Sequence, residues 1–380
     1  MHDELVAFRR DLHAHPELSR YEVRTTERVG ERLKAAGLDP QPLSGTGLYC
    51  DIGDPGAPIV ALRADIDALP VTETTGLPFA STVPGIAHAC GHDVHTTVVL
   101  GAGLLLARLL GEDFPGRSPR RVRLVFQPAE EVTPGGALDV VAAGVLEGAN
   151  AVYALHCDPR LDVGGIGSRV GAITSAFDHV RVVLHGPGGH TSRPHLTADL
   201  VYALAQVVSQ VPAAMVRRID PRSVVNLTWG RIEAGHAANA VPSEGLLEGS
   251  LRCMDSRTWE VVAEIVEELV AAVSSPYGVT SEVAVTRGVP PVDNDELRVD
   301  ALERAARAVL GPDSVSLAEQ SLGGEDFAWY LREVPGALAR LGTRTPGGRT
   351  YDLHQGDLVV DERAVAVGTR LLVALALGIR

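Results

Sequence analysis

The chain has 380 residues, of which 45% are hydrophobic and 22% charged, and its formal net charge is -14. This composition is typical of a folded globular protein, and at this length one hydrophobic core has usually stopped growing, so we expect two domains. The charge is spread along the chain without a basic run, which argues against a nucleic-acid or anionic-membrane surface. We find neither a signal-peptide pattern nor an apolar run near the ~20 residues that span a bilayer, and therefore expect a cytoplasmic protein.

Four cysteines are scattered along the sequence: Cys50, Cys90, Cys157 and Cys253. They are too few and too dispersed for a disulfide framework, so each is a candidate core residue, metal ligand or nucleophile. Only Cys90 has unusual neighbours, because it lies between two histidines.

The first part of the chain predicts an α/β domain. Residues 4–36 have helical periodicity and end at Gly37, which is a plausible helix stop. Short apolar runs then alternate with a helical stretch, predicting strands at 59–62, 122–126 and 151–155 and a helix from about Thr96 to Leu110. Such alternation is typical of an α/β sheet with helices packed on it, and the fold that we expect is a mixed sheet with helices on both faces.

The middle of the chain predicts a second, smaller α+β domain. Its strands mix apolar and polar residues, and the order of elements is β-α-β-β-α-β, with three of the four strands at 179–184, 224–229 and 245–252 and the helices at 198–211 and 259–274. Long helices return at 295–310 and 361–377 and would complete the first domain. We therefore predict a first domain of residues 1–176 and 285–380, with residues 177–284 inserted in it.

Metal-capable side chains follow the predicted strands of the first domain. Asp65 and Asp67, Glu130 and Glu131, and His156 each come after an apolar run. Ligands of open α/β sheets bind outside the carboxyl ends of the strands, so these residues should converge on one crevice. The loop His88-Ala89-Cys90-Gly91-His92-Asp93, with His95 behind it, adds imidazole and thiol groups.

Each of these residues also has an ordinary structural interpretation. Asp65 and Asp67 could shape a turn, Glu130 and Glu131 could form a solvated pair, and His156 could be a structural histidine. Because four such clusters occur together, counting the loop at 88–95, we favour one functional site over four unrelated structural roles.

The cluster has the residue types of a dinuclear hydrolase. Such an enzyme needs carboxylate and imidazole ligands for two metal ions and a separate carboxylate to deprotonate water, and Glu130 and Glu131 could divide those tasks. A thiolate ligand favours Zn²⁺, while carboxylates also accept Mn²⁺ or Co²⁺. A serine hydrolase is disfavoured because there is no Gly-x-Ser-x-Gly motif, and Cys90 as nucleophile would leave the carboxylates without a purpose.

The sequence resembles the amidohydrolase branch of the zinc aminoacylase and carboxypeptidase superfamily, which includes hippurate hydrolases, auxin-conjugate hydrolases and N-acetyl-diaminopimelate deacetylases. The resemblance extends through nearly the whole chain and is carried by segments in the family order: 13–18 (HAHPEL), 62–70 (LRADIDALP), 88–93 (HACGHD), 126–131 (FQPAEE), 188–190 (GGH), 239–242 (NAVP) and 325–327 (EDF).

The resemblance implies roles for particular residues. Two divalent metal ions would be bound by Cys90, His92, Glu131, His156 and His354. Glu130 would be the general base, and Asp65 and Asp67 would orient the ligands. The inserted domain would be a lid that forms a homodimer and supplies His190, Asn239 and Arg252 to the substrate, His190 acting from the partner subunit.

The expected reaction is hydrolysis of the amide bond of a small-molecule N-acyl amino acid. A metallo-dipeptidase or carboxypeptidase of the same superfamily is the alternative. A non-catalytic protein that kept the fold is disfavoured, because every position expected for the chemistry is filled.

Overall fold

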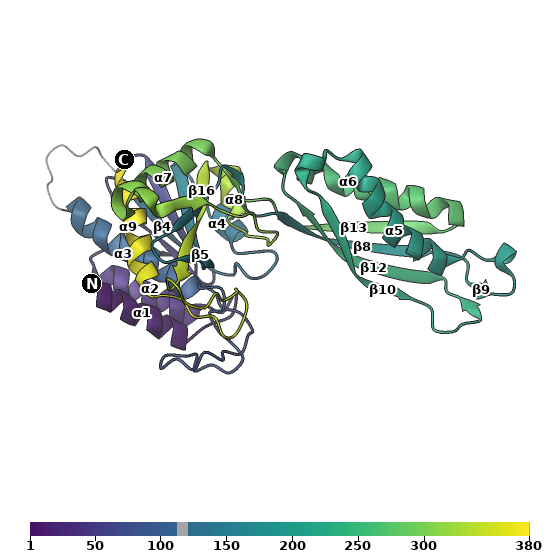
Figure 1. Ribbon diagram of the computed structural model, residues 1–380, viewed down its shortest axis with the longest axis horizontal. Coiled ribbons are helices and arrows are strands. Elements are labelled where there is room, and N and C mark those ends of the chain that lie inside the picture. Colours follow the sequence, from purple (N-terminus) through teal and green to yellow (C-terminus); the bar gives the residue numbers. More distant parts are fainter. Residues whose placement is uncertain (112–120, 380) are drawn as a thin grey trace. The chain divides into compact units, whose positions relative to one another are not determined.

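The computed structural model describes residues 1–111 and 121–379 (Figure 1). The chain divides into two compact units: unit 1 comprises Met1–Ile173, Asp293–Glu319 and Asp326–Arg380, and unit 2 comprises Thr174–Val292 and Gln320–Glu325. The sequence placed Gln320–Glu325 in the first domain. This segment instead pairs with the start of unit 2, where the Ser175 N–H donates to the Ser321 carbonyl at 3.0 Å. Such a pairing of distant segments leaves no local sequence pattern.

Unit 1 contains, in chain order, α1 (His2–Ala14), α2 (Val23–Ala35), β1 (Gln41–Pro42), β2 (Leu48–Gly53), β3 (Ile59–Asp65), α3 (His92–Gly111), β4 (Arg121–Gln127), α4 (Ala137–Ala142), β5 (Ala149–Asp162), β6 (Ile166–Ser168), β7 (Gly171–Ala172), β14 (Asp293–Asn294), α7 (Glu296–Leu310), β15 (Val315–Leu317), α8 (Ala328–Glu333), β16 (Gly336–Arg344) and α9 (Arg363–Leu377). Its main sheet has the order β1-β2-β4-β3-β5-β16-β6-β15, in which β4, β3, β5 and β16 are parallel.

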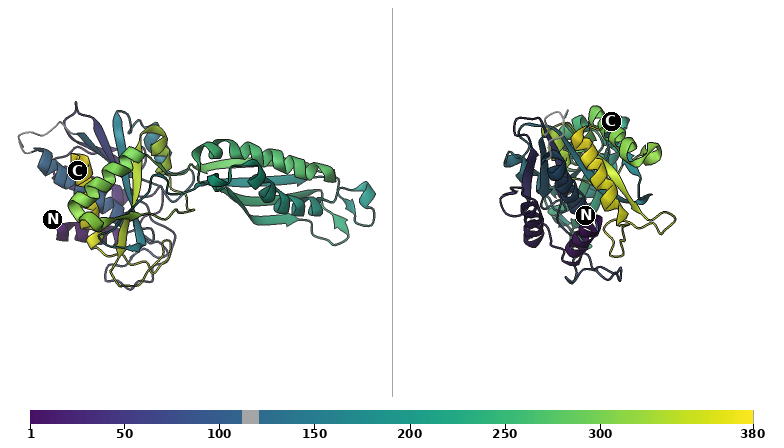
Figure 2. Two further views of the ribbon diagram at one scale, coloured as in Figure 1. Left: turned by 45° about the horizontal axis from the view of Figure 1, so that its top comes forward. Right: turned by 90° about the vertical axis from the view of Figure 1, so that its left-hand side faces the viewer.

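Helices cover both faces of this sheet. Alternate residues of a strand point to opposite faces. Leu62 and Ala64 of β3 belong to the core that includes residues of α3 and α9. Arg63 points the other way, where its guanidinium lies 5.8 Å from the ring of Phe327 at the start of α8. The predicted α/β class, with a mixed sheet and helices on its two faces, is confirmed (Figure 2).

The predicted helical stretch at 4–36 is two helices instead of one. Helix α1 ends at Ala14, two residues before Pro16. Proline lacks the N–H of a helical residue and disfavours helical dihedrals in the residue before it. The chain resumes as α2 at Val23, where the Glu17 carboxylate accepts hydrogen bonds from the N–H groups of Arg24 and Thr25.

Unit 2 contains β8 (Ala176–His185), β9 (Gly189–His190), α5 (Leu200–Arg218), β10 (Asn226–Ala234), β11 (Ala240–Val241), β12 (Glu244–Cys253), α6 (Ser256–Ser274) and β13 (Thr280–Val289). Its main sheet is antiparallel, in the order β10-β12-β8-β13, and α5 and α6 pack together on one face (Figures 1 and 2). Asp199 and Asp255 cap the two helices through the N–H groups of Tyr202 and Thr258. Without the two-residue strands β9 and β11, these elements follow the predicted β-α-β-β-α-β order.

Within residues 1–111 and 121–379, four short 3-10 helices lie between the main elements: η1 (Pro194–Leu196), η2 (Pro221–Ser223), η3 (Ser275–Tyr277) and η4 (Pro312–Ser314).

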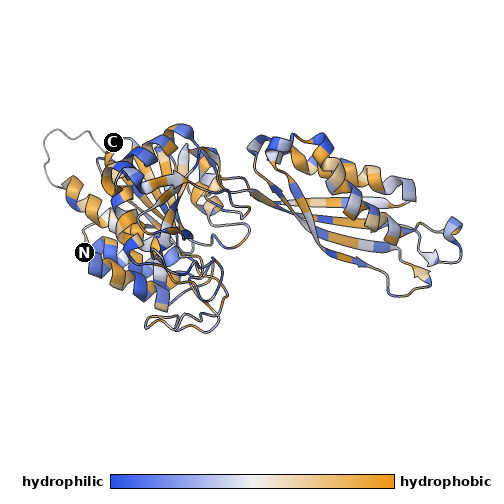
Figure 3. Ribbon diagram, viewed as in Figure 1, coloured by the Kyte–Doolittle hydropathy of each residue, from blue (hydrophilic) through white to orange (hydrophobic). Residues whose placement is uncertain are grey.

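Two helices are longer and more apolar than the sequence analysis expected. By length and composition alone, residues 92–110 of α3 and residues 200–218 of α5 could each span a membrane. In α3, 72% of this apolar stretch is buried inside the protein, as in a core helix. In α5, 33% of the apolar stretch is buried, and the helix turns one apolar face to the unit 2 sheet. Figure 3 shows such hydrophobic and hydrophilic stripes on helices of both units.

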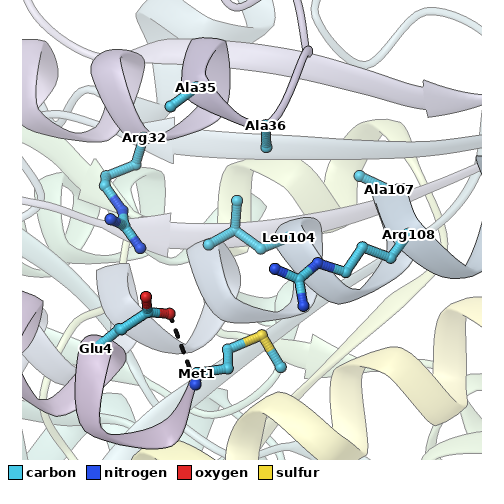
Figure 4. A pocket seen from close by; sticks show the side chains of 8 residues that line it. All are labelled: Met1, Glu4, Arg32, Ala35, Ala36, Leu104, Ala107 and Arg108. Atoms are coloured by element: carbon cyan, nitrogen blue, oxygen red, sulfur yellow. Dashed lines mark ion pairs between the residues drawn. The ribbon is translucent and has the colours of Figure 1, made fainter.

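A cleft of about 400 Å³ lies between α1, α2 and the carboxyl-terminal half of α3 (Figure 4). Arg32 and Arg108 line it, together with Glu4, whose carboxylate lies 3.6 Å from the terminal amine of Met1. A helix rises 1.5 Å per residue, so Ala107 in this cleft lies about 22 Å along α3 from its first residue. The cleft is therefore remote from the strand ends that carry the predicted site.

Candidate metal centre

The candidate site forms where the carboxyl ends of β3 and β4 meet the middle of β5 and the first turn of α3. Asp65 and Gln127 are the last residues of β3 and β4 and are paired in register. His156 lies in β5, and His92 is the first residue of α3. Parallel strands end on the same edge of a sheet, so residues far apart in sequence converge here.

The structure brings the predicted metal ligands of unit 1 together. The ligand atoms lie within 4.8 Å of one another in three overlapping groups, which are Cys90, His92 and His156; Cys90, Glu131 and His354; and His92, Glu130 and Glu131. Groups that share members in this way provide donors for two neighbouring ions.

The distances between these donor atoms fit metal coordination. Glu131 Oε1 lies 3.6 Å from His92 Nε2 and 3.4 Å from His354 Nε2, and Cys90 Sγ lies 3.6 Å from His156 Nε2. Two tetrahedral bonds of about 2.0–2.3 Å would place ligand atoms roughly 3.3–3.7 Å apart. His92 Nε2 and Glu131 Oε1 are buried without a hydrogen-bond partner in the described part of the chain. The residues therefore fit a metal.

The charge of the site also fits a cation. Burial alone would lower the pKa of His92, but the carboxylates of Asp65 and Asp67 outweigh it and raise that pKa to about 10. Burial raises the pKa of the Cys90 thiol, and the nearby carboxylates of Glu131 and Glu130 raise it further. Several acidic groups thus share one small volume, where a divalent ion could take the place of protons.

Two residues of the site have backbone dihedrals that L-residues rarely adopt. Ala129, directly before Glu130, has φ 55°, and His354 has φ 62°. Hydrogen bonds hold both: the Ala129 N–H donates to Glu22 Oε1 at 2.7 Å, and the His354 N–H donates to the Ala89 carbonyl at 2.7 Å. Unusual dihedrals of this kind persist only where surrounding contacts enforce them, and they cluster at functional sites.

Asp67 holds two of these ligands. Its Oδ1 lies 3.2 Å from His92 Nδ1, and its Oδ2 accepts hydrogen bonds from the Glu131 N–H at 3.0 Å and the Ser19 hydroxyl at 2.6 Å. Burial raises the pKa of Asp67, but these contacts, led by His92, bring it below its ordinary value. Asp67 is therefore ionised and oriented toward the ligands without joining the donor groups.

A buried network that the sequence analysis did not foresee lies beside the site. Arg63 donates to Gln127 Oε1 at 2.9 Å, to Asp65 Oδ2 at 2.7 Å and to Asp326 Oδ1 at 2.7 Å. Asp326 also accepts a hydrogen bond from the Ala137 N–H at 3.0 Å, at the start of α4. The segment 325–327 is one of the family-like motifs in the sequence, but nothing in it indicates a buried arginine partner.

The predicted substrate residues lie in unit 2, in two places. His190 of β9 pairs with Ala240 of β11, and the Asn239 carbonyl accepts a hydrogen bond from the Thr191 N–H, so His190 and Asn239 share one short ribbon. Arg252 of β12 donates to the Leu322 carbonyl, and its guanidinium lies 5.0 Å from the ring of Phe177.

His190 and Arg252 are far apart within one chain. Arg252 is opposite Phe177 near the start of β8, whereas β9 follows the other end of β8, His185. Eight residues of strand span roughly 26 Å. The structure therefore does not bring His190 and Arg252 of one chain to a common small ligand.

Known proteins are similar to this chain in sequence and in fold. Residues 61–378 match the model of peptidase family M20/M25/M40. A Rhodococcus jostii protein that bears the name of a glutamate–cysteine ligase 2-3 is 52% identical over 98% of this chain, which spans 46% of that protein's length. The N-acetylcysteine deacetylase of Bacillus subtilis is 37% identical, and the match covers 99% of this chain and 96% of that protein.

Two further matches bear on the chemistry. Thermostable carboxypeptidase 1 of Saccharolobus solfataricus is 33% identical over 96% of this chain and 93% of its own. A solved structure from Bacillus subtilis, described as a dinuclear metal binding peptidase from the M20 family, has a TM-score of 0.86 and 33% identity, and the match covers 99% of this chain and 97% of that one.

Proposed function

The chain belongs to peptidase family M20/M25/M40, whose members are metal-dependent hydrolases, and we propose that it hydrolyses an amide bond. The substrates that we propose are N-acyl amino acids. The observation that carries the proposal is the donor cluster with Glu130 and Glu131, adjacent in sequence, in the connection after β4. The relative named as an N-acetylcysteine deacetylase makes N-acetylcysteine the first substrate to test.

Cys90, His92, Glu131, His156 and His354 would hold two divalent ions. Zn²⁺ is the first candidate because the donor set includes a thiol and three imidazoles, while Mn²⁺ and Co²⁺ are alternatives. When bound, such ions supply Lewis acidity and lower the pKa of water. All four cysteines are free, and we propose a cytoplasmic location, where thiols remain reduced.

Glu130 would act as the general base. A carboxylate beside the donor cluster can accept a proton from the attacking water and return it to the leaving amine. Glu131, adjacent in sequence, has its Oε1 between His92 and His354, which leaves Glu130 to the proton transfer. Asp65 and Asp67 would orient ligands instead of binding metal.

We propose that two copies of the chain share each active site. The distance of roughly 26 Å between Arg252 and the far end of β8 is longer than one N-acyl amino acid. If both residues bind one substrate, His190 with Asn239 must come from one subunit and Arg252 from the other. A two-fold homodimer through unit 2 would satisfy this requirement. His190 would then polarise the scissile carbonyl, and Arg252 would bind the substrate carboxylate.

The test is a substrate panel under defined metal conditions. The metal-stripped protein should be inactive, and added zinc, manganese or cobalt should restore hydrolysis of N-acetylcysteine, other N-acetyl amino acids or hippurate. Glu130→Gln is the control for hydrolysis that does not use this site. Dipeptides with a free N-terminus belong in the same panel, because the carboxypeptidase relative favours a peptidase as the second candidate. Full activity without metal would overturn the proposal.

A further inference from the structure

His95 is hydrogen-bonded on one side to the Asp65 carboxylate and on the other to the backbone of Cys157. Its Nδ1 lies 2.6 Å from Asp65 Oδ1, and its Nε2 accepts a hydrogen bond from the Cys157 N–H at 2.8 Å. The side chain is buried, with 2% of the residue exposed. Both ring nitrogens of His95 are therefore engaged.

The second contact fixes the tautomer. A backbone N–H can only donate, so His95 Nε2 must present its lone pair to Cys157. The ring proton then lies on Nδ1 and is donated to Asp65. His95, Asp65 and His92 offer ligand atoms within 4.8 Å of one another, as in a metal site. Because the Nε2 lone pair of His95 is already used, this group is not a third cation site.

Cys157 connects His95 with the ligands on either side. It directly follows His156, so the N–H that binds His95 belongs to the peptide unit that carries His156. On the other side, a Cβ atom added at Gly91 would lie 2.8 Å from Cys157 Sγ, which shows how closely the loop of Cys90 and His92 packs there. Movement of Cys157 would therefore displace ligands from two elements.

The network continues from Asp65 to the loop of the general base. Asp65 Oδ2 binds Arg63, which binds Asp326, which in turn accepts the Ala137 N–H at 3.0 Å. The connection that leads to Ala137 packs tightly on Asp326, because a Cβ atom at Gly135 would lie 2.2 Å from Asp326 Oδ2. An unbroken series of hydrogen bonds thus joins the segment after Glu131 to the peptide unit of His156.

We propose that His95 is a positioning residue of the metal site: it binds no metal, and it holds His156 in place through the Cys157 N–H. This inference rests on the proposed function. Partners that orient metal ligands typically contribute 10–100-fold to metal affinity. A histidine that merely filled the core would affect stability without a separate effect on the metal.

The first experiment uses the wild-type protein, labelled with ¹⁵N-histidine and loaded with ¹¹³Cd²⁺. Ring nitrogens of His92, His156 and His354 should show coupling to cadmium. His95 should show none and should have its proton on Nδ1 with and without the ion. Cadmium coupling to His95, or a proton on its Nε2, would overturn the inference alone. Failure of the wild-type protein to bind any divalent ion would instead overturn the proposed function.

The second experiment compares His95→Leu, His95→Gln and Val98→Ala. Val98 is buried on the same helix and takes no part in the network, so its truncation controls for a general loss of stability. At saturating zinc, His95→Leu should still bind two ions per chain, with affinity lowered by about 10–100-fold. His95→Gln can keep an acceptor for Cys157 and should recover part of that loss. Binding of one ion at saturation, or an affinity equal to that of Val98→Ala, would overturn the inference.

Discussion

His92 Nδ1 lies 3.2 Å from Asp67 Oδ1, so one ring nitrogen of His92 is held by a carboxylate while Nε2 lies among the metal-capable donors. The same carboxylate binds the Glu131 N–H. We expect Asp67→Asn to weaken metal binding by about 10–100-fold, because it loses the charge that orients both ligands. Zinc affinity measured by competition with a chelating dye checks this. Ser19→Ala removes one contact of Asp67 and should have a smaller effect; equal effects would contradict the prediction.

Glu130 and Glu131 should respond differently to the same substitution. Glu130→Gln should keep both metal ions and lose at least about 10²-fold in turnover, as expected for a general base. Glu131→Gln should lose metal, because Glu131 Oε1 lies 3.6 Å from His92 Nε2 and 3.4 Å from His354 Nε2. Metal content by mass spectrometry and single-turnover rates separate the two cases. The reverse pattern would exchange the proposed roles.

The buried pair of Glu73 and His13 predicts a pH window for stability. Burial alone would raise the pKa of Glu73, but hydrogen bonds led by that from His13 lower it to about 2 from 4.5. Burial alone would lower the pKa of His13, but Asp93 and Glu73 raise it above 6.5. The Glu73 contribution is present above pH 4.5 and is lost toward pH 2. The His13 contribution is present below pH 6.5 and is lost as the pH rises through its raised pKa.

Glu73→Gln should therefore lower the free energy of unfolding most between pH 4.5 and 6.5, by about 1–3 kcal/mol. Urea unfolding across this range measures the difference from the wild type. Glu31→Gln is the control, because Glu31 pairs with Arg28 on the surface and such pairs contribute little at any pH. A difference that stays constant from pH 3 to pH 8 would show that the ion pair does not carry the effect.

Arg252 should discriminate substrates by their carboxylate. Arg252→Lys keeps the charge but loses the planar donor pair, so the KM for N-acyl amino acids should rise several-fold. The corresponding N-acyl amino acid amides lack the carboxylate and should be little affected. Steady-state kinetics on matched acid and amide substrates measure this. An equal change for both would assign Arg252 a structural role, through its contacts with Phe177 and Leu322.

Mixed dimers test the shared active site. When Glu130→Gln and His190→Ala chains form a heterodimer, a shared arrangement gives one site with both residues intact and one with both altered. The purified heterodimer should then recover about half of the wild-type activity, although each homodimeric variant is nearly inactive. If His190 serves its own subunit, no complete site exists, and the mixed dimer should stay as inactive as its parents.

The sequence by itself determined the α/β class and the residues that meet at the site. Asp65, Glu131 and His156 were readable because each follows an apolar run that predicts a strand, and parallel strands carry such residues to one edge of the sheet. In the structure β5 continues past His156 to Asp162. Periodicity also located both long helices and three of the four main-sheet strands of the second unit, since apolar residues at strand and helix spacing follow local geometry. It did not separate α1 from α2, although Pro16 was visible between them.

Only the tertiary structure decided how those residues are held. The tautomer of His95 follows from a contact with Cys157, 62 positions away in the sequence, and the orientation of Asp65 depends on Arg63 and Asp326. The separation of His190 from Arg252 required the register of β8 with β12. Hydrogen bonds between distant segments, and the dihedrals that they impose on Ala129 and His354, leave no periodic trace in the sequence, because they depend on where the folded chain brings its parts together.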